Sequence, residues 1–190
     1  MTELEKMLHG NFYNGDDPDL MKMWYEGKSI IQKFNQLPPD ALTERNALLS
    51  KLLGRVGDNL WIVSPFYVDY GSNIYFGDNC EVNMNCTFLD DNKITLGNHV
   101  IIAPNVQIYT AFHPLNASNR FDNETHNLKI QSLPVSIGDN TWIGGGTIIL
   151  PGITIGKNVV IGAGSVVTQN ISDNTIAYGN PCKIVRTNDP

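Results

Sequence analysis

The side chain best suited to catalysis is His113, which stands at the start of a long polar stretch. An imidazole has an ordinary pKa close to neutral pH, so it can move protons under working conditions. Histidines in polar loops are commonly only solvated. Here, however, Pro114 stiffens the chain after His113, and the segments just before it carry Asp90 and Asp91. We therefore expect a reactive histidine surrounded by polar side chains.

Two further amides, Asn83 and Asn85, flank Met84 in one of the preceding segments. Side chains alternate along a strand, so an inward-facing Met84 would turn both amides toward the surface. Near the C-terminus, Lys183 and Arg186 form a local basic pair in a chain of net charge −6. Such a pair is suited to binding a phosphate through charge-assisted hydrogen bonds.

Composition excludes several classes of protein. The net charge of −6 argues against nucleic acid as the main partner, and no apolar run is long enough for a membrane span. The first residues lack the apolar core of a secretory signal. Cys80, Cys86 and Cys182 show no metal-ligand spacing, so we expect free thiols, no metal site and a cytoplasmic protein.

A six-residue repeat must position these groups. Its aliphatic positions over residues 137–167 are Ile137, Ile143, Ile149, Ile155, Ile161 and Val167, and glycine follows most of them. Neither a helix nor a simple strand has this period, which is typical of the hexapeptide β-helix. We expect glycine at these positions because a side chain would be strained at the corner of a coil.

The same period occurs earlier, in sets of three separated by eight residues. The sets are Val56, Ile62 and Val68; Phe76, Val82 and Phe88; and Leu96, Ile102 and Ile108. Three hexads per coil, with two-residue insertions between the early coils, predict about five coils. The repeat stops between Ile108 and Val135, which predicts one long extruded loop, and long loops in regular folds are most often functional.

The sequence before the repeat predicts helices. Asp16-Asp-Pro-Asp is a helix start, Pro38-Pro39 ends that helix, and 43–53 carries a second apolar face. We expect these helices to cap the open end of the β-helix. The predicted organisation is a helical segment over 1–55, a β-helix over 56–178 with an extruded loop over 109–134, and a tail over 179–190.

The chain resembles the maltose, galactoside and nodulation-type O-acetyltransferases of the hexapeptide-repeat superfamily. The matching motifs include Asp69-Tyr-Gly-Ser-Asn-Ile, Asn83-x-Asn-Cys, Asp90-Asp91, Ile102-Ala-Pro-Asn, His113-Pro-Leu, Ile137-Gly-Asp-Asn-Thr-Trp-Ile-Gly-Gly, Pro151-Gly-Ile-Thr-Ile-Gly, Ile161-Gly-Ala-Gly-Ser-Val-Val-Thr and Gly179-Asn-Pro-Cys-Lys. The resemblance implies a left-handed β-helix, a homotrimer with active sites at subunit interfaces, and direct acetyl transfer from acetyl-CoA to a sugar hydroxyl.

The resemblance also implies roles for individual residues. His113 would be the general base, and the backbone amide of Gly145 would stabilise the oxyanion. Substrate-binding positions would be Asn14, Asp69, Asn83 and Asp91. The CoA-binding positions would be Trp142, Gly145, Ala163, Thr168, Gln169, Lys183 and Arg186.

Several departures touch the acceptor side. Members of this group often have Asp where Asn14 stands and Arg where Met23-Trp24 lies, and galactoside acetyltransferases have Ser in place of Asp69. The loop over 116–131 is long and lacks the usual glycine-containing turn. The acceptor sugar is therefore less well defined than the acetyl chemistry.

Three other functions stay open. N-acetylation of an amino sugar or a xenobiotic would use the same base and donor. A non-catalytic β-helix protein is a second alternative, against which the histidine and the basic tail argue. A zinc hydratase would need three converging histidines, whereas only His113 and His126 lie in the loop.

Overall fold

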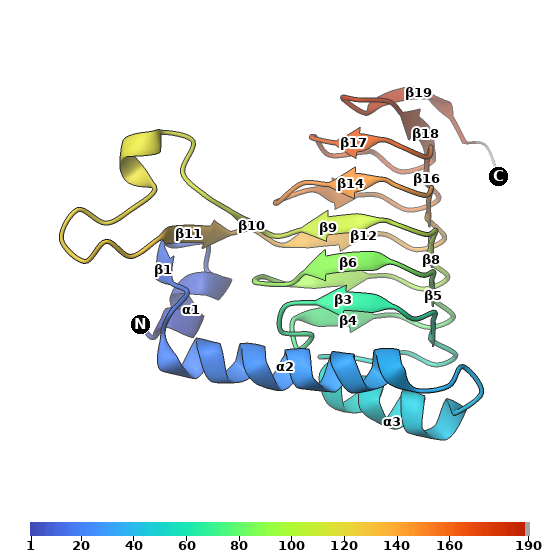
Figure 1. The fold of residues 1–190 in the computed structure, drawn as a ribbon. Helices are drawn as coiled ribbons and strands as arrows, with labels where there is room; N and C mark the ends of the chain where they lie inside the picture. The colour runs from blue at the N-terminus through green and yellow to red at the C-terminus, as the bar shows by residue number, and fades with distance from the viewer. Residues whose placement is uncertain (189–190) are drawn as a thin grey trace.

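The computed structural model describes residues 1–188 as a column of short parallel strands with helices across one end (Figure 1). One side of the column contains β4 (Ile74–Phe76), β7 (Ile94–Leu96), β12 (Val135–Ile137) and β15 (Thr154–Ile155). A second contains β2 (Trp61–Ile62), β5 (Glu81–Val82), β8 (Ile101–Ile102), β13 (Trp142–Ile143), β16 (Val160–Ile161), β18 (Thr175–Tyr178) and the antiparallel β19 (Lys183–Thr187). The third contains β3 (Phe66–Val68), β6 (Cys86–Leu89), β9 (Gln107–Tyr109), β14 (Ile148–Ile149) and β17 (Val166–Val167).

The predicted β-helix is confirmed, but it has about six coils rather than five. Successive levels of the first side are marked by Arg55, Phe76, Leu96, Ile137, Ile155 and Ile171. The sixth level was missed because Ile171 follows Val167 by four residues and so leaves the six-residue register. The two-residue insertions are confirmed by the pairing of successive coils. Tyr75 and its partner Thr95 are two residues farther apart in sequence than Ser136 and its partner Thr154.

The repeat positions form the core, with one exception. All the aliphatic and aromatic positions from Ile62 to Val167 in the predicted register are buried, whereas Val56 is 38% exposed. Val56 lies in the terminal coil, beside a cavity of about 380 Å³ that α3 (Leu42–Leu52) leaves open. The first coil is therefore covered only in part at this position.

Glycines in the repeat are required by close packing of successive coils. A Cβ on Gly138 would lie 2.6 Å from the carbonyl carbon of Gly156, and one on Gly144 would lie 2.6 Å from the amide nitrogen of Ala163. Neither residue has a positive φ. The expectation that a side chain would be strained here is confirmed, and the close approach of the next coil is the cause.

The helical cap is confirmed. α1 (Glu3–Leu8), α2 (Pro18–Gln36) and α3 come before the first coil, and α2 begins after Asp17, whose carboxylate accepts from the amides of Asp19 and Leu20. Figure 1 shows α2 and α3 lying across the end of the column. Phe34 and Leu49 join the core of the β-helix from these helices. No helix among residues 1–188 is both long and apolar enough to cross a membrane.

The extruded loop carries a small sheet. β10 (Ala111–Phe112) pairs with β11 (Lys129–Ser132), and β11 pairs on its other side with β1 (Tyr13–Asn14). A short 3₁₀ helix, η1 (Ala117–Asn119), lies between β10 and β11. The loop therefore rests on the N-terminal segment (Figure 1), a contact that its lack of periodicity concealed.

Candidate active site

A cavity of about 230 Å³ lies where the N-terminal segment, the β-helix and the loop meet. Its walls are Tyr13, Gly15, Met21, Trp24, Asp69, Tyr70, Asp91 and Ile130. Two of the predicted substrate-binding residues, Asp69 and Asp91, are thus in one cavity.

Asp91 is fixed by a phenol that the sequence did not single out. The hydroxyl of Tyr13 donates to Oδ1 of Asp91 at 2.6 Å. Burial raises the pKa of Asp91 to about 6, although the Tyr13 hydrogen bond lowers it. Burial and the charge of Asp91 also raise the pKa of Tyr13, so the phenol keeps its proton and remains the donor.

Asp69 is held by two side chains of α2. The indole Nε1 of Trp24 donates to its Oδ1 at 3.2 Å, and the ammonium of Lys28 lies 2.9 Å from the same oxygen. The Lys28 ammonium is also 4.9 Å from the centroid of the Trp24 ring. Trp24 and Lys28 thus set the orientation of Asp69, and neither was predicted to do so.

Asp90 has a structural position and does not line the cavity. Its buried carboxylate accepts from the backbone amides of Asp69 at 3.0 Å, Tyr70 at 2.9 Å and Asn73 at 3.2 Å. Burial raises the pKa of Asp90 to about 7, while these hydrogen bonds act in the opposite direction. Asp90 therefore fixes the turn that carries Asp69.

His113 follows β10 and is exposed. Its Nδ1 lies 3.1 Å from the carbonyl oxygen of Lys129 on β11. A carbonyl only accepts hydrogen bonds, so Nδ1 must carry the hydrogen, which leaves the Nε2 lone pair of the neutral ring free. The antiparallel pairing of β10 with β11 creates this contact.

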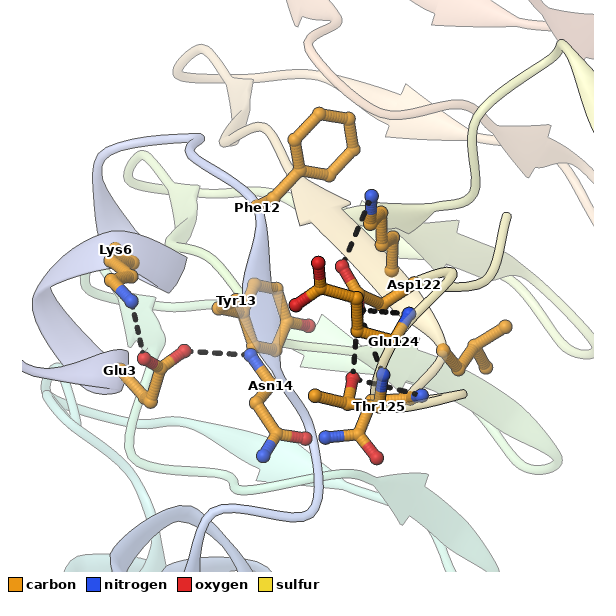
Figure 2. A pocket seen from close by; sticks show the side chains of 11 residues that line it. Glu3, Lys6, Phe12, Tyr13, Asn14, Asp122, Glu124 and Thr125 are labelled. Atoms are coloured by element: carbon orange, nitrogen blue, oxygen red, sulfur yellow. Dashed lines mark hydrogen bonds and ion pairs between the residues drawn. The ribbon is translucent and has the colours of Figure 1, made fainter. Parts of the chain in front are cut away.

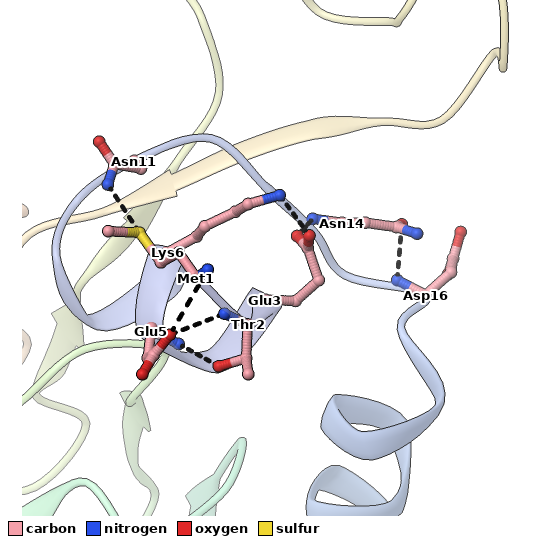
Figure 3. A network of polar contacts seen from close by, with 8 residues as sticks. All are labelled: Met1, Thr2, Glu3, Glu5, Lys6, Asn11, Asn14 and Asp16. Atoms are coloured by element: carbon pink, nitrogen blue, oxygen red, sulfur yellow. Dashed lines mark hydrogen bonds and ion pairs between the residues drawn. The ribbon is translucent and has the colours of Figure 1, made fainter.

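Asn14 lies beside the cavity rather than in it. Its backbone amide donates to Glu3 at 2.7 Å, and its side-chain oxygen accepts from the amide of Asp16 (Figure 3). Asn83 lies farther away, after β5, and its amide donates to Glu81 at 3.0 Å. Met84 is 43% exposed, so the expectation of an inward Met84 is wrong. Asn85 has a φ of 61°, which marks a corner of the coil rather than a strand.

The predicted site residues lie at opposite ends of the strands in the sheet β3–β6–β9–β14–β17. Asp69, Asp91 and His113 follow the ends of β3, β6 and β9, whereas Asn83 and Gly145 precede β6 and β14. A strand of three or four residues is roughly 10–13 Å long. One chain therefore does not bring Gly145 and Asn83 together with His113.

Gly145 belongs to a column of corner residues that also contains Met84, Pro104 and Ala163. The adjacent amides are used between coils, because Gly144 donates to Ile161 and Gly146 donates to Pro104. The amide of Gly145 has no acceptor within residues 1–188. It is a backbone donor available to a ligand.

The remaining predicted CoA-binding residues line the outer surface. Trp142 on β13 is 50% exposed and pairs with Ile101, which is 46% exposed. Ala163, Thr168 and Gln169 are exposed near β17, and Lys183 and Arg186 are exposed on β19. Neither basic residue forms an ion pair in the described part of the chain. No group of three or more His, Cys, Asp or Glu in residues 1–188 is arranged to hold a metal ion.

Known proteins share both the cap and the repeat. Residues 6–57 match the maltose acetyltransferase hexapeptide capping motif, and 134–169 match the six-repeat bacterial transferase hexapeptide. Galactoside O-acetyltransferase of Escherichia coli is 38% identical over 186 residues, 98% of this chain and 89% of that protein. The chain belongs to the maltose/galactoside O-acetyltransferase family. It is an acetyltransferase of this type.

Solved structures agree with this family. The maltose O-acetyltransferase from Clostridium difficile is 47% identical and superimposes with a TM-score of 0.95, covering 100% of this chain and 99% of that one. A galactoside acetyltransferase in complex with coenzyme A is 38% identical, with a TM-score of 0.94 over 100% of this chain and 92% of the other.

The raised pKa of Asp91 predicts how the stability of this acetyltransferase changes with pH. An acid whose pKa is raised in the folded state binds more protons in the native state than in the unfolded state. Its contribution to the free energy of unfolding therefore falls as pH rises from about 4 to about 7. Replacing Asp91→Asn removes this contribution. Urea unfolding at fixed protein concentration is expected to show the variant gaining stability relative to wild type over this range, by on the order of 2 kcal/mol.

Asp139→Asn is the matched control. The amide of Asn98 and the side chain of Lys157 lower the pKa of Asp139, so this variant is expected to lose stability relative to wild type as pH rises from the acid range. If both variants changed with pH in the same direction, the assignment for Asp91 would be wrong.

Proposed function

We propose that the protein transfers acetyl from acetyl-CoA directly to a sugar hydroxyl, with His113 as the general base. The observation that carries this proposal is the hydrogen bond of His113 Nδ1 to Lys129, which leaves Nε2 free to take a proton. The nearby cavity presents Asp69 and Asp91, and carboxylates are suited to accept hydrogen bonds from sugar hydroxyls.

The reaction needs no group beyond the two substrates and the protein. Nε2 of His113 takes the hydroxyl proton while the sugar oxygen bonds to the thioester carbon. The carbonyl oxygen gains negative charge and accepts a hydrogen bond from the amide of Gly145. When the intermediate collapses, the carbon–sulfur bond breaks, and the imidazolium returns its proton to the departing CoA sulfur.

The acceptor is held mainly by the polar wall of the cavity. Asp91, braced by Tyr13, and Asp69, braced by Trp24 and Lys28, accept hydrogen bonds from hydroxyls. Asn83 and Asn14 complete the substrate-binding set. Because Met23-Trp24 stands where related enzymes often have Arg, we expect the preferred sugar to differ in the groups that it presents to this side of the cavity.

A complete site needs two copies of the chain. His113 lies beyond the C-terminal ends of the strands, and Gly145 lies before their N-terminal ends. They meet the same acetyl group only if these two ends, from two neighbouring copies, face each other. Trp61 at 52% exposure, with Ile101 and Trp142, gives one face a column of exposed apolar side chains, interrupted by Glu81, that association would bury. We propose a homotrimer with three sites at its interfaces.

Acetyl-CoA lies against the exposed residues Trp142, Ala163, Thr168 and Gln169 on the outer surface, while the cations of Lys183 and Arg186 bind CoA phosphates. We place the reaction in the cytoplasm, because Cys80, Cys86 and Cys182 are free, buried thiols. The net charge of −6 argues against nucleic acid as the main partner.

Removing both tail cations is expected to weaken binding of acetyl-CoA. Lys183→Ala combined with Arg186→Ala should raise the KM for acetyl-CoA about fivefold, the size of one or two exposed charge contacts. The KM for acetyl-dephospho-CoA should change less. Equal effects on both donors would remove the proposed phosphate contact, and Lys51→Ala, on α3 at the far end of the column, is the control.

A screen of acceptors with acetyl-CoA tests the proposed function. Release of CoA thiol is measured with maltose, glucose, galactosides and amino sugars. Turnover with neutral sugars supports O-acetylation. Turnover confined to amino sugars would replace it with N-acetylation.

A further inference from the structure

A cluster of buried polar side chains lies where the extruded loop leaves the β-helix. Its members, the root cluster, are Asn92 at 2% exposure and Thr110 and Ser132, both at 0%. Asn92 directly follows Asp91 in the sequence. Thr110 lies between β9 and β10, and Ser132 is the last residue of β11. None of the three lines the cavity that contains Asp69 and Asp91.

Asn92 is the centre of the root cluster. Its Nδ2 lies within hydrogen-bond distance of four oxygens, which are the carbonyls of Met7 at 3.1 Å, Leu8 at 3.3 Å and Ser132 at 3.3 Å, and the hydroxyl of Ser132 at 3.2 Å. The amide has two hydrogens, so these acceptors share them. Its Oδ1 accepts from the backbone amide of Lys93 at 2.8 Å. Both ends of the Asn92 side chain are therefore fixed.

The first segment that Asn92 holds is the end of α1. The last carbonyls of a helix have no partner within the helix, and here Asn92 donates to two of them. The hydroxyl of Ser132 also donates to one of these carbonyls, that of Met7, at 2.7 Å. The chain continues from α1 into β1, where Tyr13 donates to Asp91. The root cluster thus holds the segment that braces Asp91.

The second segment that Asn92 holds is the β10–β11 hairpin, which carries His113. The hydroxyl of Thr110 accepts from the backbone amide of Asn92 at 2.9 Å and donates to the last carbonyl of β6 at 2.7 Å. Ser132 attaches the other strand of the hairpin to the Asn92 side chain. The two residues of β10 then lead to His113, and β11 supplies the carbonyl of Lys129 that orients its ring. Both strands are therefore fixed where they leave the β-helix.

The far end of the hairpin has no comparable attachment. Figure 2 shows the tip of the loop facing the N-terminal segment across a second cavity, of about 350 Å³. Asp122 on one wall accepts from amides of its own loop, and Glu3 on the other accepts from the amide of Asn14. Among residues 1–188, the side chains of 115–128 form hydrogen bonds only within the loop. The root cluster and the backbone pairing of β11 with β1 therefore set the direction of the hairpin.

We propose that Asn92 is a positioning residue for the reaction, which sets the imidazole of His113 relative to Asp91 through the root cluster. The inference rests on the proposed role of His113 as the general base. A base works only when its nitrogen reaches the acceptor hydroxyl, and a displacement of about 1 Å can cost about 100-fold in rate. Asn92 itself is buried and touches no substrate, so it acts only through the segments that it holds.

Asn92→Ala is expected to lower kcat about tenfold, because the hairpin is no longer fixed at its root. The KM for acetyl-CoA should not change, since none of the proposed CoA-binding residues lies on α1, β10 or β11. Steady-state kinetics measure both constants.

Asn35→Ala is the matched control. The Asn35 side chain also joins a helix to the β-helix, with Nδ2 2.8 Å from the carbonyl oxygen of Phe66 and Oδ1 2.9 Å from its amide nitrogen. It touches neither the hairpin nor the N-terminal strand β1. Urea unfolding at fixed protein concentration should show a loss of stability in both variants, whereas kcat should fall only in Asn92→Ala.

¹⁵N NMR of histidine-labelled protein separates positioning from a loss of stability. With Nδ1 of His113 donating to Lys129, the neutral ring should give one protonated and one unprotonated nitrogen signal. In Asn92→Ala these two signals should move toward each other, because the weakened contact lets both tautomers form. Asn35→Ala should keep the wild-type pattern, and His113→Ala identifies the signals.

The proposal requires Asn92→Ala to change both kcat and the ¹⁵N pattern and Asn35→Ala to change neither, and any other combination overturns it. If Asn92→Ala does not fold, Ser132→Ala removes one partner and should give the same changes to a smaller extent. Wild-type behaviour of Ser132→Ala would then overturn the proposal. Near-normal turnover of His113→Ala would instead remove the proposed base, and the ¹⁵N pattern would decide alone whether Asn92 orients the ring.

Discussion

His113→Ala is expected to lower kcat at least about 100-fold, the usual contribution of a positioned general base. The variant keeps the substrate-binding groups, because His113 is exposed and its one hydrogen bond in the structure is to the carbonyl of Lys129. The KM for acetyl-CoA should therefore change little. Steady-state kinetics with the best acceptor of the screen measure both constants.

His126→Ala is the matched control for this loss. His126 is also exposed and belongs to the same loop, but it lines neither cavity. It should retain near-normal turnover, and size-exclusion chromatography should show the same assembly for both variants. Near-normal turnover of His113→Ala would sink the assignment of the base.

Gly145→Pro is expected to lower kcat by about 10²–10³, as for the loss of one oxyanion donor. Proline removes the amide hydrogen that has no acceptor in residues 1–188. The equivalent corner of the preceding coil already carries Pro104, so the backbone of this corner is compatible with proline. The effect should therefore appear in kcat rather than in folding.

Gly145→Ala separates the amide from the side chain. A Cβ at this position would lie 3.2 Å from the carbonyl oxygen of Pro104, which is a tight contact. Alanine nevertheless keeps the backbone N–H. Alanine should retain most of the activity that proline loses. Equal losses in the two variants, with circular dichroism and assembly unchanged, would show that space and not the amide matters here.

The core of the fold could be predicted from sequence because each coil repeats one simple constraint. Every inward position from Ile62 to Val167 packs against the same position of the coils above and below it, so apolar residues recur every six residues within a coil. The ends do not obey this constraint. Val56 has a coil on one side only, and Ile171 continues the core outside the six-residue register.

The acceptor side was predicted only in part, because its geometry comes from contacts between distant segments. Asp91 stood out as an acid shortly before the break in the repeat, whereas Asp69 was assigned only through the family resemblance. Their partners Tyr13, Trp24 and Lys28 come from the N-terminal segment, which was expected only to cap the β-helix. Pairing of β1 with β11, which brings these segments together, leaves no local signal.

Asp90 and Asn83 show a different limit of sequence reasoning. Asp90, which accepts from three backbone amides, and Asp91, which lines the cavity, are adjacent in sequence. Only the direction of each side chain distinguishes their roles. Asn83 lies at the sheet edge opposite Asp91 within one chain. In the proposed trimer its place in the site depends on a second copy, which the sequence of one chain does not position.

The central claim is that acetyl passes directly from acetyl-CoA to a sugar hydroxyl. The most direct test is mass spectrometry of protein and sugar together, quenched during turnover with the best acceptor of the screen. The account predicts an acetyl ester on the sugar, one CoA released for each ester, and unmodified protein. Acetyl on a protein side chain that forms and disappears at the rate of turnover, or acetyl found only on amino groups of the acceptor, would contradict it.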